Sequence, residues 1–258
     1  MIDVTIFKKP KHPVAVVIPI YRTELTAFEV MSLDNCLNVL GKHKIIVIAP
    51  QGLSVEAIIN LNTHNITIEY FGKKYFKNLL GYNKLMLSFN FYRKFIDYEY
   101  ILIYQLDAFV FSDKLLDWCN LGFDYIGAPW IDEEWSAYPE MSKYIDKYKM
   151  RVDKVNTVGN GGFSLRNVRS ALKALLLLSS KRLTWKLNED IFWSFEVPIN
   201  LSFFKIPCEE VALKFSFETK PRICFEKNNS ELPFGCHGWQ KNDIEFWRPI
   251  FKELGYEI

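Results

Sequence analysis

Four short motifs carry the side chains of this sequence that could do chemistry. They are Asp107 after an apolar run, a glycine-rich turn at 159–162, the acidic pair Glu189-Asp190, and His237 between two glycines. Carboxylates and imidazoles transfer protons and bind metal ions. Glycines allow a backbone to approach a ligand closely. These motifs are far apart in the sequence, so only the fold can bring them together.

Asp107 is placed directly after a predicted buried strand. Residues 101–104 form a continuous apolar run, which is typical of a central strand covered on both faces. An isolated buried carboxylate at this point would cost on the order of several kcal/mol unless a cation or hydrogen bonds met it. Ligands of open α/β sheets bind beyond the carboxyl ends of strands, so a metal ion or a nucleotide ribose is a natural partner. Taken alone, a capping or turn aspartate is an equally good interpretation.

Each of the other three motifs also has an ordinary structural interpretation. The glycines at 159–162 can form a plain connection, and neither GxxxxGK[ST] nor GxGxxG spacing is present. Glu189 and Asp190 precede an apolar helical run, as ordinary N-terminal caps and helix-dipole partners do. A lone histidine such as His237 is more often a surface or satisfied core residue than a metal ligand. None of these motifs identifies a function by itself.

The elements that would position these motifs alternate between strands and helices. This order predicts a doubly wound, mostly parallel sheet. Polar and aromatic residues without clear periodicity predict a functional loop or lid at 131–155. Short strand-like pieces are expected within 208–223. Buried strands are predicted at 14–21 and in the run ending at 104, and further strands at 44–49 and 66–71. The predicted helices span about 23–41, 54–61, 78–96, 113–120, 167–180 and 243–254.

Composition excludes several classes of protein. The 258 residues, 49% of them hydrophobic, can bury the core of one large α/β domain. The 32 basic and 30 acidic residues nearly cancel, which gives no electrostatic case for a nucleic-acid partner. The five cysteines are scattered and include no CxxC pair, so a disulfide framework and a zinc knuckle are disfavoured and a reducing compartment fits best. No apolar run near the amino terminus approaches the ~20 residues of a membrane span.

Five motifs taken in order resemble the set carried by a bacterial family of GT-A-type glycosyltransferases, largely uncharacterised and once labelled a domain of unknown function. They are QLDAFVF, YIGAPW, GNGGFSLR, NEDIFWS and PFGCHGW, and the resemblance covers roughly 14–239. It implies a single GT-A domain over 1–258, with a Rossmann-like mixed, mostly parallel sheet flanked by helices. Within it, a nucleotide-binding half at about 12–125, an acceptor and catalytic half at about 126–240 and a C-terminal helix at 241–258 are expected.

The resemblance also implies a site for a nucleotide-sugar donor and a metal ion. GT-A enzymes carry a D-x-D element that holds Mn²⁺ or Mg²⁺ against the diphosphate. Here Gln105 replaces the first acid, and Asp107 is the expected metal ligand, so strict metal dependence is in question. His237 is expected to complete the metal site, and Gln105 to contact the ribose or phosphate. The donor base, ribose and phosphate are expected at Pro19, Tyr21 and Arg22.

The catalytic residues follow from the same resemblance. In an inverting enzyme Asp190 would take the proton from the acceptor hydroxyl, and Glu189 would orient the acceptor. In a retaining enzyme these carboxylates would hold the acceptor or stabilise an oxocarbenium-like state. The sugar and acceptor contacts are expected at Asn160, Gly161, Gly162, Ser164, Trp130 and Trp239.

The sequence therefore predicts a glycosyltransferase that moves a hexose, with UDP-hexose as the expected donor, to a glycan or glycolipid acceptor. Inversion is favoured, and the expected pathway is bacterial surface polysaccharide synthesis, as for lipopolysaccharide, O-antigen or capsule. The expected location is the cytoplasm, with contact at the cytoplasmic face of the inner membrane. Lys73, Lys74 and Lys77 could rest on anionic lipid, although a solvated surface is the ordinary alternative.

Two other functions remain open at this point. A nucleotidyltransferase acting on a sugar phosphate would use a similar sheet, but it usually carries a Gly-rich, basic segment after the first strand, and 19–22 lacks one. A catalytically silent module that binds sugar or nucleotide is also compatible with the incomplete metal motif. A silent module would bind nucleotide without transferring a sugar, whereas an enzyme would do both.

Overall fold

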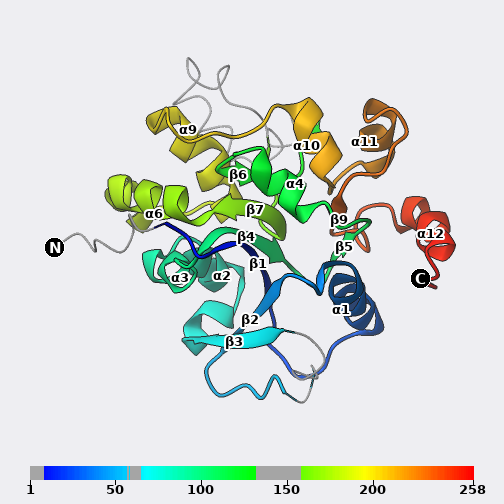
Figure 1. The fold of residues 1–258 in the computed structure, drawn as a ribbon, viewed down its shortest axis with the longest axis horizontal. Coiled ribbons are helices and arrows are strands. Elements are labelled where there is room, and N and C mark those ends of the chain that lie inside the picture. The colour runs from blue at the N-terminus through cyan, green and yellow to red at the C-terminus, as the bar shows by residue number, and fades with distance from the viewer. Residues whose placement is uncertain (1–8, 57, 59–64, 132–157) are drawn as a thin grey trace.

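A six-stranded mixed sheet forms the centre of the protein, with the strand order β3-β2-β1-β4-β7-β6 (Figure 1). The computed structural model describes residues 9–56, 58, 65–131 and 158–258. Strands β3, β2, β1 and β4 are parallel, and β7 is antiparallel to both β4 and β6. The predicted mixed, mostly parallel sheet is therefore confirmed. Its strands are β1 (His12–Pro19), β2 (Lys44–Pro50), β3 (Ile66–Phe71), β4 (Tyr98–Tyr104), β6 (Tyr125–Ile126) and β7 (Phe163–Asn167).

Helices cover both faces of this sheet. Val16 and Ile18 of β1 pack toward α1 (Ala27–Leu40) and α4 (Leu115–Asn120). Ala15 and Val17 face the opposite side, which α2 (Leu79–Met86), α3 (Phe89–Lys94) and α6 (Val168–Leu177) cover (Figure 1). Burial on both faces explains why the central strands β1, β2 and β4 contain continuous apolar runs.

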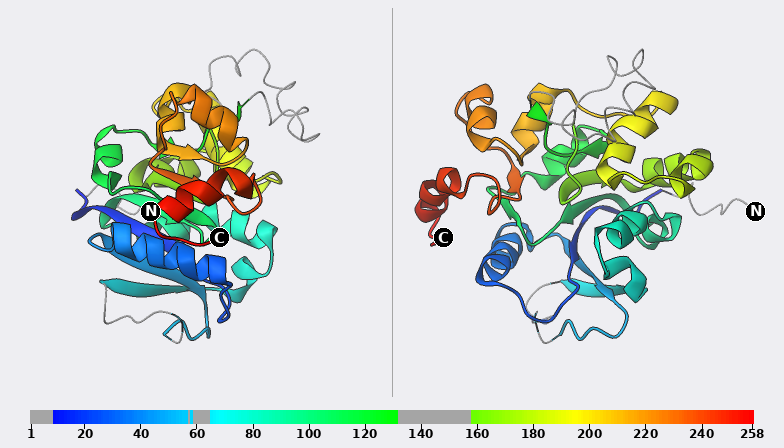
Figure 2. Two further views of the ribbon diagram at one scale, coloured as in Figure 1. Left: turned by 90° about the vertical axis from the view of Figure 1, so that its right-hand side faces the viewer. Right: turned by 180° about the vertical axis from the view of Figure 1, so that it is seen from behind.

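A smaller sheet brings the C-terminal part of the chain back to the end of β4. It has the order β5-β9-β8, in which β9 is antiparallel to β5 and parallel to β8. The C-terminal helix α12 packs Trp247 and Phe251 against Phe109 of β5, and Figure 2 shows α12 beside α1. The elements are β5 (Ala108–Val110), β8 (Ser216–Phe217), β9 (Gly235–His237) and α12 (Ile244–Glu253).

Three predicted elements need correction. The long helix expected at 78–96 is two helices, α2 and α3. Leu87 is the C-cap of the first, and Ser88 is the N-cap of the second. The strand-like stretch within 208–223 contains the helix α10, whose first turn carries Glu209 and Glu210, as the helix dipole favours. Residues 54–56 of the helix expected at 54–61 are not helical, and most of its remainder lies outside the described residues.

The loop or lid expected at 131–155 also lies outside the described residues, apart from Ile131. Within the described ranges, no helix is long and apolar enough to cross a bilayer. The remaining helices are η2 (Lys73–Phe76), α7 (Ser179–Leu183), α8 (Glu189–Ile191), the π-helical turn η4 (Phe192–Glu196), α9 (Val197–Asn200), α10 (Glu209–Phe215) and α11 (Pro221–Lys227).

Candidate functional site

The residues predicted to hold the donor line one pocket of about 510 Å³. Pro19, Tyr21 and Arg22 follow β1, and Gln105 and Asp107 follow β4. These strands are parallel neighbours in the sheet, and β2 lies beyond β1 while β7 lies beyond β4. The pocket therefore occupies the point where the strand order reverses, the usual ligand-binding position in open α/β sheets. We call it the donor pocket.

The donor pocket also contains polar groups that sequence reasoning did not select. Lys77 and Lys241 line it and contribute positive charge. Gln240 Nε2 belongs to another lining residue and is buried without a hydrogen-bond partner among the described residues, and the buried Tyr82 hydroxyl, also in the lining, lies beside Gln105. Buried polar atoms that lack a partner are costly, so they mark places where a polar ligand would be favoured. The position of Tyr82 within an apolar stripe gave no signal of this role.

Tyr21 and Arg22 differ in how available they are to a ligand. The Tyr21 side chain is 52% exposed, so its ring can stack on a base. Arg22 Nη2 instead lies 2.7 and 2.6 Å from the two carboxylate oxygens of Glu29. Glu29 also accepts a hydrogen bond from the Thr26 amide at the start of α1. The predicted phosphate contact of Arg22 would therefore compete with Glu29.

Asp107 and His237 lie in direct contact beside the donor pocket. The antiparallel pairing of β5 with β9 places Ala108 opposite His237, and His237 Nε2 is 3.0 Å from Asp107 Oδ1. These two atoms form an ion pair, and Nε2 is buried. The other ring nitrogen, Nδ1, is 2.9 Å from Glu218 Oε1. One imidazole thus connects two carboxylates.

These charges shift the acidity of both partners. Burial lowers the pKa of His237, but the negative charges of Asp107 and Glu218 outweigh burial and raise it to about 10. Burial raises the pKa of Asp107, but His237 and then Lys241 hold it well below its usual range. Without a metal ion, His237 is therefore an imidazolium paired with Asp107. A metal ion at Nε2 would have to displace a proton, so its binding would become stronger as the pH rises.

The donor atoms of this pair fit a divalent cation. Two ligands at neighbouring corners of an octahedral site with bonds of about 2.1 Å are about 3.0 Å apart, and Asp107 Oδ1 and His237 Nε2 have this separation. A carboxylate on the second ring nitrogen, here Glu218, is the usual outer partner of a metal-bound histidine. The described residues contain no group of three or more His, Cys, Asp or Glu side chains that could hold a metal ion. A substrate or water could supply further ligands.

Sequence reasoning missed Glu218 because the segment before it gave an ambiguous pattern. Residues 212–217 read as a strand, whereas most of them end α10 and only Ser216 and Phe217 form β8. The parallel pairing of Phe217 with Cys236 places Glu218 next to His237. An acid directly after a strand was the signal used for Asp107, and the same signal could have identified Glu218.

The glycines of the turn at 159–162 allow side chains, rather than a sugar, to approach the backbone. A Cβ at Gly161 would overlap the Glu189 carboxylate, and a Cβ at Gly162 would overlap the His237 imidazole. The backbone of Gly162 also accepts a hydrogen bond from Gln105 N at 2.8 Å. The predicted close approach at Gly161 and Gly162 is thus made by residues of the site itself.

We expect Gly162→Ala to lower the free energy of unfolding by about 1–3 kcal/mol, because the added methyl group must displace His237. The measurement is urea unfolding. Gly72→Ala is the control, since its Cβ would be 3.9 Å from Tyr75, an ordinary contact distance. Equal stability of both variants would show that His237 moves aside without cost.

Glu189 is held by a buried arginine. Arg166 Nη1 and Nη2 each lie 2.8 Å from one carboxylate oxygen of Glu189, and both side chains are almost fully buried. Arg166 also donates to Ser164 Oγ and to Tyr92 Oη, each at 3.0 Å. This corrects the predicted role of Glu189 in orienting the acceptor, because both of its oxygens are engaged. Its charge instead acts on its neighbour Asp190.

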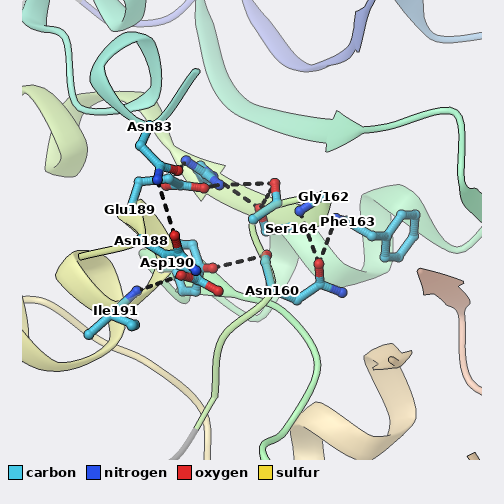
Figure 3. A network of polar contacts seen from close by, with 12 residues as sticks. Asn83, Asn160, Gly162, Phe163, Ser164, Asn188, Glu189, Asp190 and Ile191 are labelled. Atoms are coloured by element: carbon cyan, nitrogen blue, oxygen red, sulfur yellow. Dashed lines mark hydrogen bonds and ion pairs between the residues drawn. The ribbon is translucent and has the colours of Figure 1, made fainter. Parts of the chain in front are cut away.

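Asp190 retains the properties of a proton acceptor. It is partly exposed, and its Oδ1 accepts a hydrogen bond from the Ile191 amide at 2.9 Å (Figure 3). Burial, followed by the negative charges of Glu189 and Glu218, raises its pKa to about 7. A general base works best with a pKa near the operating pH. Gly161 lies against Glu189 and the adjacent Gly162 lies against His237, so the acidic pair is near the Asp107–His237 contact.

The structure corrects three predicted sugar contacts. Asn160, Ser164 and Trp239 are buried, with 1%, 0% and 0% of their surfaces exposed. Asn160 Oδ1 accepts hydrogen bonds from the amides of Gly162 and Phe163 (Figure 3). Ser164 accepts from Arg166, and Trp239 packs edge-on against Phe251 in the core below α12. These residues support the site and present almost no surface to a ligand, and Asn160 Nδ2 is buried without a hydrogen-bond partner among the described residues.

Trp130 keeps part of its surface exposed, so its predicted contact with sugar or acceptor stays a prediction. Its ring stacks on Phe195 with the centroids 5.6 Å apart. Gly159 is required beneath it, because a Cβ there would overlap the indole. The aromatic faces of Trp130, in YIGAPW, and of Phe195, directly after NEDIFWS, therefore meet.

Two solved glycosyltransferases share this fold. One is the apo-form glycosyltransferase GlyE of Streptococcus pneumoniae TIGR4, with a TM-score of 0.50 and 13% identity over 87% of this chain and 54% of that chain. The other is the apo structure of the bifunctional glycosyltransferase WbbM, with a TM-score of 0.59 and 14% identity over 90% of this chain and 46% of that chain. This chain thus spans about half the length of each.

Identities this low show the fold alone, and they confirm the predicted GT-A-type architecture. A search of curated protein sequences gave no significant match. The match to a family model covers residues 65–237, which include Asp107, both carboxylates of the acidic pair and His237. The chain therefore belongs to the family described as "Protein of unknown function (DUF5672)".

Proposed function

We propose that this protein is a glycosyltransferase that uses a nucleoside diphosphate sugar, with UDP-hexose as the first donor to test. One observation carries the proposal. In a fold shared with glycosyltransferases, Asp107 and His237 meet at the edge of a pocket of about 510 Å³, with His237 Nε2 buried and 3.0 Å from Asp107 Oδ1. Such a pocket is large enough for a cofactor-sized ligand.

The donor pocket offers a suitable group for each part of a nucleotide-sugar. The exposed ring of Tyr21 would stack on the base. Lys77 and Lys241 would attract the diphosphate, and the buried Tyr82 hydroxyl would donate to one of its oxygens or to the ribose. Gln105, at the position of the missing acid, would supply an amide to the ribose or phosphate.

Asp107 and His237 would hold Mn²⁺ or Mg²⁺, and Glu218 would keep the imidazole oriented with Nε2 toward that ion. When bound, the ion would neutralise negative charge on the departing nucleoside diphosphate. Lys241 Nζ lies 3.4 Å from Asp107 Oδ2, so this carboxylate is next to a positively charged side chain even without a metal ion. Lys241 would also attract the diphosphate.

Asp190 would accept the proton of the acceptor hydroxyl, which favours inversion of configuration. Glu189 would keep Asp190 basic through its negative charge, and Arg166 would hold Glu189 in place. The proposed acceptor is a glycan or glycolipid of a bacterial surface polysaccharide such as lipopolysaccharide, O-antigen or capsule. The proposed location is the cytoplasm, at the cytoplasmic face of the membrane.

Calorimetric titration with UDP in the presence of Mn²⁺ tests the donor site. We expect Asp107→Ala and His237→Ala each to abolish the Mn²⁺-dependent part of binding, because each removes one of the proposed metal ligands. Asp117→Ala, at an exposed acid on α4, is the control and should bind like the unaltered protein. Unchanged UDP binding in both site variants would remove the metal role of this pair.

One alternative keeps a specific observation in its favour. Glu189 is fully engaged by Arg166, and the D-x-D element lacks its first acid, so a nucleotide-binding module without activity is conceivable. Such a module would bind UDP, but it would not produce UDP from a UDP-sugar when acceptor is present. The nucleotidyltransferase loses support, because the only basic residue within 19–22 is already paired with Glu29.

A further inference from the structure

A second groove of about 510 Å³ lies on the opposite face of α2 from the donor pocket. Asn78, the N-cap of α2, lines both spaces, while Tyr82 faces the donor pocket and Lys84 faces the groove. The groove is lined by three basic side chains, Lys74, Lys84 and Arg182, and by no acidic residue. We call it the basic groove.

Arg182 is the strongest indication of what the basic groove binds. The side chain is partly buried, and its Nη1 donates to Leu87 O at 3.1 Å. Its Nε is buried without a hydrogen-bond partner, and no carboxylate of the described residues forms an ion pair with it. Burial lowers its pKa. A partly buried guanidinium without a counter-charge is unfavourable, and an anionic ligand would relieve it.

The two lysines of the groove are also available to an anion. Neither Lys74 nor Lys84 lies within ion-pair distance of a carboxylate among the described residues. By contrast, Lys94 on the neighbouring helix α3 pairs with Glu69 at 2.7 Å. The positive charge of the basic groove is therefore unbalanced at three positions.

The far wall of the basic groove leads to the acidic pair. Asn83 Nδ2 donates to Asn188 Oδ1 at 3.2 Å, and Trp185 Nε1 donates to Asn188 O at 3.0 Å. Asn188 immediately precedes Glu189 and Asp190, and Figure 3 shows Asn83 directed toward this segment. A ligand lying along the groove would thus contact the residues that position the proposed base.

We propose that the basic groove binds an anionic saccharide, a sugar carrying a carboxylate or phosphate, as part of the acceptor. The term acceptor rests on the proposed glycosyltransferase function, whereas the anion site does not. The rings of Tyr75 and Trp185 and the amides of Asn78 and Asn83 in its lining are groups that contact sugars. A membrane surface fits less well, because a flat lipid face cannot reach a partly buried guanidinium.

Saturation-transfer NMR and calorimetry with matched probes test this site. Trigalacturonate and glucose 6-phosphate supply a carboxylate and a phosphate, and maltotriose and glucose are their neutral counterparts. We expect the charged probes to bind and the neutral ones to bind at least tenfold more weakly. Arg182→Gln should weaken the charged probes about tenfold. If only the carboxylate probe or only the phosphate probe binds, the result identifies the anionic group that the groove recognises.

Lys84→Gln provides a second variant at an exposed position, in case Arg182→Gln does not fold as judged by circular dichroism. It should weaken the charged probes several-fold, about threefold or more. Lys252→Gln on α12 is the matched control outside the groove and should leave binding unchanged. Equal binding of charged and neutral probes, or no loss in both groove variants, would overturn the proposal. So would Lys84-dependent binding to phosphatidylglycerol vesicles without binding to any saccharide.

Titration of the same variants with UDP separates this inference from the proposed function. UDP binding without charge-selective saccharide binding would overturn the basic groove alone. Saccharide binding that depends on Arg182, in a protein that binds no UDP, would overturn the glycosyltransferase proposal and leave the anion site standing.

Discussion

Replacement of Asp190 by asparagine will lower the rate of sugar transfer by about 10² or more and leave donor affinity unchanged. Asparagine can still accept the hydrogen bond of the Ile191 amide, so the local structure should persist. It cannot accept the proton of the acceptor hydroxyl. UDP release gives the rate, and calorimetry with UDP gives the affinity. The control is Asp117→Asn on the exposed side of α4, which should change neither.

The pH profile gives Asp190 a second readout. Burial and the charges of Glu189 and Glu218 raise its pKa to about 7, and a general base acts only when unprotonated. The value of kcat/KM should therefore rise as the pH increases through about 7 and level off above it. Full activity of Asp190→Asn would transfer the proposed role to Glu189 or indicate a retaining mechanism.

Replacement of Arg166 by methionine will lower the free energy of unfolding by about 3–5 kcal/mol, because it leaves the buried carboxylate of Glu189 without its partner. The hydrogen bonds from Arg166 to Ser164 and Tyr92 are lost as well. Urea unfolding measures the change. Arg248→Met is the control, because its pairing with Glu245 is exposed and should contribute less than about 1 kcal/mol.

The double variant Arg166→Met, Glu189→Leu distinguishes an unpaired charge from a packing defect. Removing both partners should recover much of the stability lost in Arg166→Met, since no buried carboxylate remains. A loss of less than about 1 kcal/mol in the single variant would contradict the burial of this pair. A double variant as unstable as the single one would assign the loss to packing.

The central strands were predictable because helices bury them on both faces. Residues 14–21 and 45–49 are continuous apolar runs, whereas the edge strand at 66–71 mixes polar and apolar residues, and each predicted range closely matches an observed strand. The break between α2 and α3 was not predictable from periodicity, because the apolar stripe continues across Leu87 and Ser88. Where the two helices separate depends on how they pack, which the spacing of apolar residues does not record.

The convergence of the site depends on contacts between distant segments. Pairing of β5 with β9 brings His237 to Asp107, and no local pattern records that pairing. Residue types alone also misplaced some contacts. The tryptophan in PFGCHGW was expected to contact a sugar, but Trp239 is buried in the core. Glu189 resembled a free acid because its partner Arg166 lies on another element, β7.

The most direct test of the donor site is anomalous diffraction from crystals grown with UDP and Mn²⁺. The expected map has one manganese peak in contact with Asp107 Oδ1 and His237 Nε2, with UDP in the donor pocket and its base against Tyr21. A nucleotide bound elsewhere, or no metal at this pair although UDP is bound, would contradict the proposed donor site.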